Sequence, residues 1–255
     1  MRFDRRVALV TGASQGIGEA VAARMAAEGA RVAVVASASL DKADLVVRKL
    51  NGGVERNKAF ACDVRDAAKV ERLVGDVAEH FGAIDILVNA AGVFFPTPVG
   101  ATSVEELDRI VDINLKGAWN LINAAGPAMR ERKTGRIVNV ASVAGVMGFG
   151  SYAIYCATKA AIIMMTRALA NELAPHGVNI NCVAPGNTAT PMNLDVRTKE
   201  ELKPFLNAMS ARTPSGRTFS EPGEIANIVA FLASDEARAM HGSCILADEG
   251  FSAGM

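Results

Sequence analysis

Two side chains that could exchange a proton lie four residues apart near the middle of the chain. Tyr155 and Lys159 stand in the segment 151–159, and on a helix positions i and i+4 share one face. A phenol has an ordinary pKa of ~10, too high for efficient proton exchange at neutral pH, and a nearby ammonium group lowers it. Lowering the pKa by about three units takes roughly 4 kcal/mol, at ~1.4 kcal/mol per unit. The only other tyrosine, Tyr152, has Cys156 four residues on, so the pairing selects Tyr155.

The spacing alone does not show that Tyr155 is catalytic. Tyr-x-x-x-Lys also arises by chance, and an isolated match is more often a pair on a helix surface that does no chemistry. The rest of the chain must supply a substrate oxygen, a route for the proton and a reaction partner before Tyr155 is a candidate catalyst.

The composition indicates a folded α/β chain and excludes several functional classes. Half of the 255 residues are hydrophobic, which suits one domain with a buried sheet and does not suit disorder. Lys plus Arg number 27 and Asp plus Glu number 27, so no basic excess points to nucleic acid. The apolar run after the charged N-terminus, Val7–Val10, is too short for a signal peptide or a membrane span. We expect a cytoplasmic protein that binds neither nucleic acid nor membrane.

The cysteines and histidines show no metal-binding pattern. The four cysteines, Cys62, Cys156, Cys182 and Cys244, form no C-x-x-C motif and have no histidine at ligand spacing. We expect them to be small buried hydrophobic residues in a reducing compartment. No metal site is predicted.

Short β-branched runs alternate with longer helical stretches along the whole chain. The predicted strands are Val7–Val10, Arg31–Val35, Ala59–Cys62, Ile84–Val88, Arg136–Val140, Val178–Val183 and Ser243–Ala247. The predicted helices include Gly18–Glu28, Ala67–His80, Val104–Arg132, Tyr152–Ala174 and Pro222–Leu232. Several strands are apolar almost throughout, which is typical of strands covered on both faces of a parallel sheet. The pattern predicts a single α/β domain over residues 1–255, a Rossmann-type, doubly wound, mainly parallel seven-stranded sheet with helices on both faces.

One long segment lacks strong periodicity. Residues 187–220 carry Pro191, Pro204 and Pro214 among mixed charges. A segment of this kind inside a folded domain is often a lid or a substrate-binding loop. The alternative is a surface excursion with two short helices, and the sequence favours neither.

A glycine-rich turn follows the first predicted strand, with the sequence Thr11-Gly12-Ala13-Ser14-Gln15-Gly16-Ile17-Gly18. Glycines between a strand and a helix let the backbone approach a pyrophosphate, which then lies at the positive N-terminus of the helix. A mere tight turn is the alternative. The position at the first strand–helix junction favours dinucleotide binding.

With this turn the chain resembles the short-chain dehydrogenase/reductase family, whose fingerprint is Thr-Gly-x-x-x-Gly-x-Gly. The resemblance continues at Asp63-Val64 after the third strand and at Pro185-Gly186 after the sixth. The segment Asn89-Ala90-Ala91-Gly92 follows the fourth strand and resembles the family's Asn-Asn-Ala-Gly, with Ala90 in place of the second Asn. Asn114 lies in the long helix before the fifth strand, where the family has its catalytic Asn, and Ser142 precedes Tyr155 at the family's spacing. Six motifs in the family's order make the resemblance specific, and it covers almost the whole chain.

Two sets of residues follow from this resemblance. The implied catalytic residues are Asn114, Ser142, Tyr155 and Lys159. The implied cofactor contacts are Gly12, Ser14, Gln15, Gly16, Ile17, Gly18, Ser37, Asp63, Val64, Asn89, Ala90, Gly92, Tyr155, Lys159, Pro185, Gly186, Thr188 and Thr190. Taken singly, the polar members have ordinary structural roles, such as a helix cap at Asp63 or a tie between strands at Asn89.

The resemblance implies hydride transfer between a nicotinamide and a carbonyl or secondary alcohol. Tyr155 is expected to act as general acid in reduction and general base in oxidation, while Ser142 donates a hydrogen bond to the same substrate oxygen. Lys159 is expected to lower the pKa of Tyr155 and to bind the nicotinamide ribose. Asn114 is expected to hold a water that links Lys159 to solvent.

The end of the second strand bears on the choice of cofactor. An acidic residue there usually binds the ribose hydroxyls of NAD, and this chain has Ala36-Ser37-Ala38-Ser39 instead. Without a carboxylate to repel a 2′-phosphate, the sequence favours NADP(H) over NAD(H). Against this, no basic residue stands at Gln15 or Ser37, where family members that prefer NADP often have one, and removing repulsion is only half of specificity.

The substrate pocket is expected at the loops after the fourth, fifth and sixth strands, because ligands lie at the carboxyl ends of parallel strands. The apolar side chains of these loops are Val93, Phe94, Phe95, Val146, Met147, Phe149 and Met192. An apolar lining favours a small, rather apolar ketone or alcohol. Packing against the rest of the domain is the alternative for each of them.

The chain departs from the family at two places. Thr188 stands where relatives usually have Val or Ile, and Glu249 stands where Asp-Gly-Gly is usual. Relatives commonly form homotetramers through two long helices and the last strand, so we expect a homo-oligomer. Small residues such as Ala157, Ala160 and Ala161 permit close helix contact, or else pack on the chain's own sheet.

Two other functions occur on chains with these motifs. A non-catalytic dinucleotide-binding sensor or scaffold usually lacks the Tyr or the Lys, both of which this chain has. An epimerase or dehydratase on the same fold would show no net cofactor turnover. The sequence favours an NAD(P)-dependent oxidoreductase acting on CH–OH groups.

Overall fold

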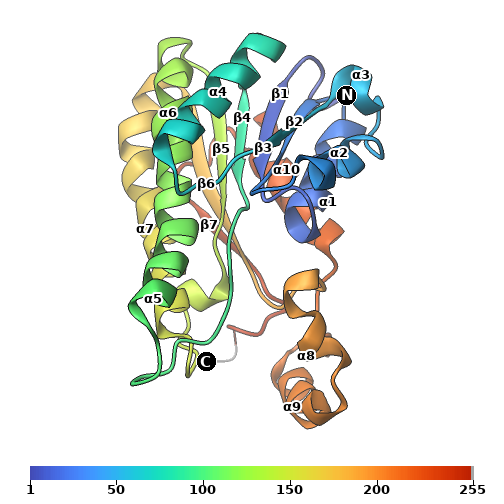
Figure 1. Ribbon diagram of the computed structural model, residues 1–255, viewed down its shortest axis with the longest axis vertical. Helices are drawn as coiled ribbons and strands as arrows, with labels where there is room; N and C mark the ends of the chain where they lie inside the picture. Colours follow the sequence, from blue (N-terminus) through green and yellow to red (C-terminus); the bar gives the residue numbers. More distant parts are fainter. Residues whose placement is uncertain (254–255) are drawn as a thin grey trace.

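A parallel sheet with helices on both faces forms the centre of the computed structural model, which describes residues 1–253 (Figure 1). Over these residues the sheet has seven strands in the order β3-β2-β1-β4-β5-β6-β7. The strands are β1 (Val7–Thr11), β2 (Arg31–Ala36), β3 (Lys58–Ala61), β4 (Ile86–Asn89), β5 (Gly135–Val140), β6 (Val178–Pro185) and β7 (Cys244–Ala247). Every predicted strand is present, with ends displaced by two residues or fewer.

The apolar strands are buried because helices cover both faces of the sheet. Every residue of β1, β4 and β6 is buried. One face is covered by α1 (Gly16–Ala27), α2 (Leu40–Val47) and α10 (Pro222–Leu232), and the other by α4 (Ala67–Phe81), α6 (Gly117–Glu131) and α7 (Ala153–Leu173). This arrangement confirms the predicted doubly wound α/β sheet.

The helices differ from the prediction in two places. Ser39 accepts a hydrogen bond from the Lys42 backbone and so caps α2, which the sequence analysis did not predict, and the short helix α3 (Gly53–Arg56) follows it. The single helix predicted over 104–132 is interrupted. It consists of α5 (Val104–Val111), a π-helical turn (Asp112–Lys116) and α6, and Asn114 lies in that turn.

The strand order reverses between β1 and β4, which are neighbours in space. The chain runs outward from β1 through β2 to β3, then returns to β4 and continues to β7. The register pairs Thr11 with Asn89, the last residues of β1 and β4. In open α/β sheets this switch point, at the carboxyl ends of the strands, is where ligands bind.

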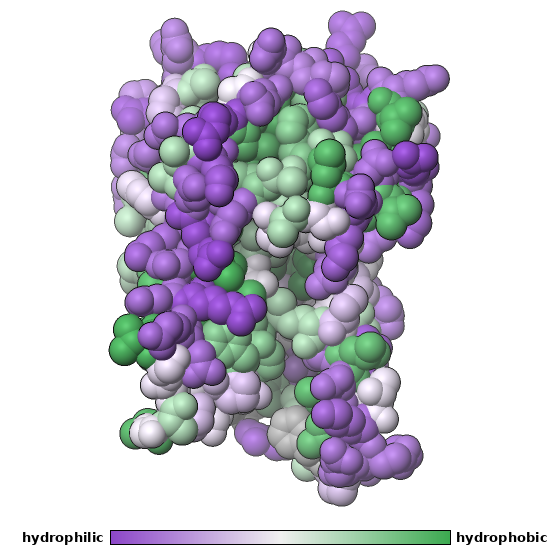
Figure 2. Space-filling model, in the orientation of Figure 1, coloured by the Kyte–Doolittle hydropathy of each residue, from purple (hydrophilic) through white to green (hydrophobic). Residues whose placement is uncertain are grey.

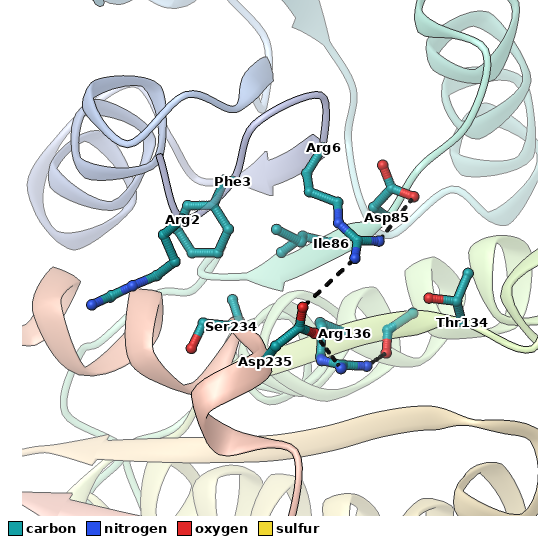
Figure 3. A pocket seen from close by; sticks show the side chains of 11 residues that line it. Arg2, Phe3, Arg6, Asp85, Ile86, Thr134, Arg136, Ser234 and Asp235 are labelled. Atoms are coloured by element: carbon teal, nitrogen blue, oxygen red, sulfur yellow. Dashed lines mark hydrogen bonds and ion pairs between the residues drawn. The ribbon is translucent and has the colours of Figure 1, made fainter.

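The opposite end of the sheet carries a network of charged side chains (Figure 3). Arg6 and Arg136 both face Asp235, at 3.9 and 2.8 Å, and Arg6 also reaches Asp85 at 4.0 Å. Asp85 in turn accepts a hydrogen bond from the Val7 backbone. The cavity among them has a volume of about 10 Å³, room for one water at most. The charged network connects the N-terminal segment to the rest of the protein, and the cavity is too small to bind a substrate.

Residues 187–220 form a separate group at the carboxyl end of the sheet. They contain α8 (Leu194–Thr198) and α9 (Lys203–Arg212), which lie apart from the helix layers in Figure 1. The two short helices agree with one of the two sequence interpretations. A lid function for this segment stays a prediction.

Within residues 1–253, one helical stretch is long and apolar enough to meet the length and hydropathy of a membrane span. It covers residues 153–176 and includes α7. Buried helices of folded domains meet the same criteria, and α7 packs against β6 and carries Tyr155 and Lys159.

Candidate active site

Tyr155 and Lys159 lie in the first two turns of α7, at the carboxyl end of the sheet. Lys159 is buried, with 6% of its surface exposed, whereas Tyr155 is half-buried. The Lys159 ammonium donates a hydrogen bond to the Val140 carbonyl oxygen at 3.0 Å and lies 5.7 Å from the centre of the Tyr155 ring. The two side chains therefore share one face of the helix, as their spacing predicts, with Lys159 fixed to the end of β5.

The electrostatics of the pair differ from the expectation. Burial raises the pKa of Tyr155 to about 12, although the neighbouring Ser142 hydroxyl acts in the opposite direction. Burial also lowers the pKa of Lys159 to about 8. The causes that shift the pKa of Tyr155 are its burial, the Ser142 hydroxyl and Cys156, and the charge of Lys159 is not among them. A lowering of the Tyr155 pKa by Lys159 is not seen in the protein alone, and that role of Lys159 stays a prediction.

Ser142 lies at the end of β5, where the strand turns toward α7. Its hydroxyl accepts a hydrogen bond from the Ala144 backbone at 3.2 Å and donates to the Pro185 carbonyl oxygen at 3.5 Å. It is near enough to the phenol to influence the pKa of Tyr155. Both hydroxyl groups can therefore reach one substrate oxygen, as the spacing of Ser142 and Tyr155 predicts.

Asn114 is placed in the site by the π-helical turn. Its side chain is buried and accepts a hydrogen bond from the Val93 backbone N–H at 2.8 Å. Its amide nitrogen donates to the Val93 carbonyl at 3.0 Å and to the Thr158 hydroxyl at 3.3 Å. Asn114 thus joins the loop after β4 to α7, next to Lys159. π-helical turns of this kind frequently occur at functional sites.

The turn after β1 fits a pyrophosphate. A Cβ atom on Gly12 would lie 2.8 Å from backbone atoms of Ala90 and Ala91, and one on Gly18 would overlap the Gly12 carbonyl oxygen. The N-cap residue of α1, Gln15, makes no side-chain cap, so its side chain does not occupy the backbone N–H groups of the first turn. Ser14 and Gln15 are accessible to a ligand, and Ile17 packs partly against the core. Free N–H groups at a helix N-terminus favour an anion.

Gly92, in the loop after β4, lies close to Lys159, where the nicotinamide end of the cofactor is expected. A Cβ atom on Gly92 would lie 3.3 Å from the Asn114 Oδ1 atom and 3.7 Å from the Lys159 Nζ atom. Because glycine has a hydrogen atom in place of Cβ, Gly92 leaves the space in front of these two groups open. The residues present therefore fit a dinucleotide that extends from the α1 N-terminus to Lys159.

Asn89 and Ala90 have structural roles at the end of β4. The Asn89 side chain donates a hydrogen bond to Asn139 on β5, which in turn donates to Thr166 on α7. The Ala90 backbone N–H donates to the Thr11 hydroxyl. The tie between strands that was one interpretation of Asn89 is present.

Asp63 and Val64 follow β3, which lies at one edge of the sheet. Both oxygens of the Asp63 carboxylate accept hydrogen bonds from the Arg65 guanidinium, and this contact lowers the pKa of Asp63. Val64 is buried, and its carbonyl oxygen accepts a hydrogen bond from Asn120. Arg65 was not among the predicted site residues. Its spacing two residues after an acidic residue is the only signal in the sequence.

Ser37 lies exposed just after the end of β2, between β2 and α2. Ser39, two residues on, caps α2, and the Lys42 side chain is also exposed. No acidic side chain stands between Ala36 and the start of α2.

The residues after β6 close the site from the other side. Gly186 packs against Asp248, and Thr188 is buried and donates a hydrogen bond to the Gly186 carbonyl oxygen. The Thr190 side chain lies 3.2 Å from the position of a Cβ atom on Gly16. The loop after β6 therefore contacts the start of α1 beside the predicted cofactor site.

The predicted substrate pocket is hollowed and apolar. Figure 2 shows a recess between the part of the surface that carries α5 and the part that carries α8 and α9, with mostly apolar colouring at its floor. Of the predicted lining residues, Val146 and Met192 are about half exposed. Met147 is buried, which agrees with the alternative of packing against the rest of the domain.

The aromatic residues of these loops pair with one another. Phe94 stacks parallel to Tyr152 at 4.5 Å and meets Tyr155 edge-on at 4.8 Å. Phe95 lies under the Arg109 guanidinium, and Phe149 stacks on Phe251. The contacts of Phe94 with both tyrosines carry no signal in the sequence, because they depend on how the loop after β4 folds onto α7.

Comparisons with known proteins agree with this geometry. The sequence model of the family described as enoyl-(acyl carrier protein) reductase matches residues 12–252. The chain is 40% identical to 3-oxoacyl-[acyl-carrier-protein] reductase FabG of Staphylococcus aureus over 93% of this chain and 94% of that protein. It is 38% identical to D-threitol dehydrogenase of Mycolicibacterium smegmatis over 98% and 94%. A solved structure, gluconate 5-dehydrogenase from Burkholderia cenocepacia in complex with NADP and tartrate, superposes with a TM-score of 0.92 at 29% identity, over 100% and 98%.

Proposed function

This chain belongs to the short-chain dehydrogenase/reductase family, and from this premise we propose that Tyr155 is the proton-transfer group of its reaction. The protein is an NAD(P)-dependent oxidoreductase that interconverts a carbonyl group and a CH–OH group. The observation that carries the assignment of Tyr155 is its place beside Ser142 and Lys159, at the carboxyl end of the sheet. A phenol there can give or take the proton of one substrate oxygen.

The other residues act on the same proton and the same oxygen. A bound nicotinamide would supply or accept the hydride. Ser142 donates a hydrogen bond to the substrate oxygen and stabilises negative charge that develops on it. Lys159 binds the cofactor ribose and contributes positive charge that favours the Tyr155 phenolate once further positive charge is present. Asn114 holds the loop after β4 and the first turns of α7 together, and positions a water that relays protons from Lys159.

The dinucleotide extends along the switch point between β1 and β4. The N–H groups of Gly16 to Gly18 would bind its pyrophosphate, and Asp63 and Val64 would contact its adenine. The ribose and nicotinamide meet Asn89 to Gly92, Pro185, Gly186, Thr188 and Thr190. The open space in front of Gly92 supports this placement.

NADP(H) is the cofactor that the end of β2 favours. The exposed Ser37 can donate a hydrogen bond to a 2′-phosphate, and no carboxylate beside it repels one. The related gluconate 5-dehydrogenase was solved with NADP. Comparing kcat/KM with NADPH and with NADH tests the preference, and a higher value with NADH overturns it.

The substrate is a small ketone or secondary alcohol with an apolar part. The half-exposed side chains of Val146 and Met192 and the apolar recess support this choice. Residues 187–220 act as the lid over this recess. Limited proteolysis with and without cofactor tests the lid, since closure would protect the segment.

The enzyme acts as a homotetramer in the cytoplasm. Trp119 on α6, Met164 on α7 and Leu246 on the edge strand β7 expose 46, 59 and 46% of their surfaces. Ala157 and Ala160 are exposed and so remain available for a partner helix. Large exposed apolar side chains on adjoining elements mark interaction surfaces. Light scattering after gel filtration tests the assembly, and a monomer at micromolar concentration contradicts it.

The reaction class is tested by cofactor oxidation with a panel of carbonyl compounds. The panel contains a cyclic ketone, an aryl ketone, a keto sugar acid and a 3-oxoacyl thioester, each with NADPH and with NADH, and absorbance at the nicotinamide band reports turnover. We expect oxidation with at least one apolar ketone by the wild type and a kcat lower by about 10² or more in Tyr155→Phe. Equal turnover by the two proteins would exclude Tyr155 as the proton-transfer group.

A further inference from the structure

The helix that carries Tyr155 begins without a cap of its own. Tyr152 is the N-cap residue of α7, and its side chain caps no backbone N–H group. Ser151, just before it, has a φ of +65°, in the left-handed region that favours glycine. The start of α7 thus lacks local stabilisation, although it must hold the phenol of Tyr155 in place.

A residue from another loop supplies the missing contacts. The Thr97 hydroxyl accepts a hydrogen bond from the Ile154 backbone N–H in the first turn of α7, at 3.4 Å, and is buried. The Thr97 backbone N–H donates to the Ser151 carbonyl oxygen at 2.6 Å. Thr97 therefore takes the place of an N-cap residue and also binds the residue with the left-handed conformation.

The same loop contacts the catalytic side chain. Phe94 lies with its ring parallel to Tyr152, at 4.5 Å and an interplanar angle of 2°, and meets the Tyr155 ring at 4.8 Å and 76°. Offset-stacked and edge-to-face contacts at these distances are favourable and directional. Both tyrosines of the chain thus rest on one phenylalanine.

The loop is itself held rigidly. Asn114 binds both backbone groups of Val93, one residue before Phe94. The segment from Val93 to Thr97 is therefore fixed at one end by the π-helical turn and at the other by the start of α7. Both ends of this segment beside Tyr155 are hydrogen-bonded, Val93 to the buried Asn114 and Thr97 to Ser151 and Ile154.

We propose that Phe94 and Thr97 are positioning residues for the reaction, which hold Tyr155 in its reactive place from outside its helix. The proposal rests on the proposed role of Tyr155 in proton transfer. Proton transfer requires hydrogen-bond distances, and small displacements of a catalytic group cost large factors in rate. The loop after β4 thus positions Tyr155 in addition to lining the cofactor and substrate site.

The first experiment separates the hydroxyl of Thr97 from its bulk. Thr97→Val removes the cap and keeps the shape, Thr97→Ser keeps the cap, and Thr102→Val is the matched control. Thr102 lies in the same connection, and its hydroxyl bonds only the Pro98 carbonyl oxygen. We expect Thr97→Val to lower kcat by about tenfold with the KM for the cofactor within about twofold of wild type. Thr97→Ser should restore kcat, and Thr102→Val should match the wild type.

The second experiment uses the pH profile, which a merely structural residue would not move. The polar or titratable groups near the phenol are Ser142, Cys156 and Lys159, all unchanged by substitution at Phe94. Phe94→Ala admits water to the phenol, so the pKa of Tyr155 falls from its raised value and the alkaline loss of the reduction rate moves to lower pH. Phe94→Tyr keeps an aromatic ring and should keep the wild-type profile, while Phe94→Leu serves if the alanine variant does not fold.

Three outcomes are distinguishable. If Thr97→Val and Phe94→Ala have wild-type kcat and pH profiles while Tyr155→Phe is inactive, the positioning role is overturned and the proposed function stands. If substitution at Phe94 raises only the KM for the ketone, Phe94 is a substrate contact, which also overturns the proposal. If Tyr155→Phe keeps wild-type turnover, the proposed function itself fails.

Discussion

Replacing Lys159 by methionine should stabilise the protein at neutral pH while abolishing turnover. Lys159 is 6% exposed, and burial lowers its pKa from the ordinary 10.5 to about 8. Below pH 8 the amine is charged in the folded and the unfolded state, and the folded state bears the full cost of burying the charge. That cost is about 3 kcal/mol, for a difference of about 2.5 units at ~1.4 kcal/mol per unit.

The pH dependence follows from the same two pKa values. Between pH 8 and pH 10.5 the unfolded amine binds more protons than the folded one, so wild-type stability rises with pH through this interval. Above pH 10.5 both amines are neutral and the cost is absent. The variant also loses the hydrogen bond from Nζ to the Val140 carbonyl oxygen, worth about 1 kcal/mol. We expect a net gain of about 2 kcal/mol at pH 7 and almost none at pH 10.

Urea unfolding of the cofactor-free proteins at pH 7 and pH 10, at one protein concentration, measures the difference. Lys116→Met is the matched control. Lys116 is exposed on the neighbouring π-helical turn, and its ion pair with Asp112 raises its pKa, so its removal should not stabilise the protein at either pH. A Lys159→Met variant less stable than wild type at pH 7, or a gain that persists at pH 10, would refute the reasoning.

Three further substitutions test other parts of the site. Ser37→Asp places a carboxylate beside the expected 2′-phosphate and should shift the kcat/KM ratio toward NADH by roughly tenfold, ~1.4 kcal/mol, in steady-state assays. Asn114→Ala removes three buried hydrogen bonds and should lower the free energy of unfolding by about 3 kcal/mol, at about 1 kcal/mol each; a melting temperature equal to wild type contradicts the bracing role. Glu249 has a φ of +60° and binds Ser220. Glu249→Gly relieves that strain and Glu249→Gln does not, so the glycine variant should melt higher than the glutamine variant.

The sheet was predictable because its strands are short, apolar and separated by helical patterns. Strands such as Val178–Pro185 are covered on both faces and buried throughout. Strands of this kind are rich in apolar residues, and the sequence shows this directly. The helix α2 was missed because its eight residues give little periodicity, although Ser39 is a recognisable cap. The π-helical turn at Asn114 was also missed, because the apolar pattern runs through it from α5 to α6.

The sequence predicted which site residues lie close together, because their motifs follow the ends of neighbouring strands. It did not predict their pKa values. Spacing places Lys159 on the face of Tyr155, but the pKa of each depends on burial, which the sequence does not reveal. Cys62 and Cys182 are buried as expected, whereas Cys156 and Cys244 are half-buried, so that expectation is wrong for two of the four. The contacts of Phe94 and Thr97 with α7 join loops more than fifty residues apart, and no local pattern encodes them.

The central claim is that Tyr155 transfers the proton, and one measurement on Tyr155→Phe tests it most directly. Cofactor affinity and kcat are measured on the same preparation, by fluorescence titration and by cofactor oxidation with the best ketone of the panel. The phenyl ring keeps the contact with Phe94 and removes only the hydroxyl. We predict a dissociation constant for the cofactor within about twofold of wild type and a kcat lower by about 10² to 10⁴. A kcat within about tenfold of wild type would contradict the account.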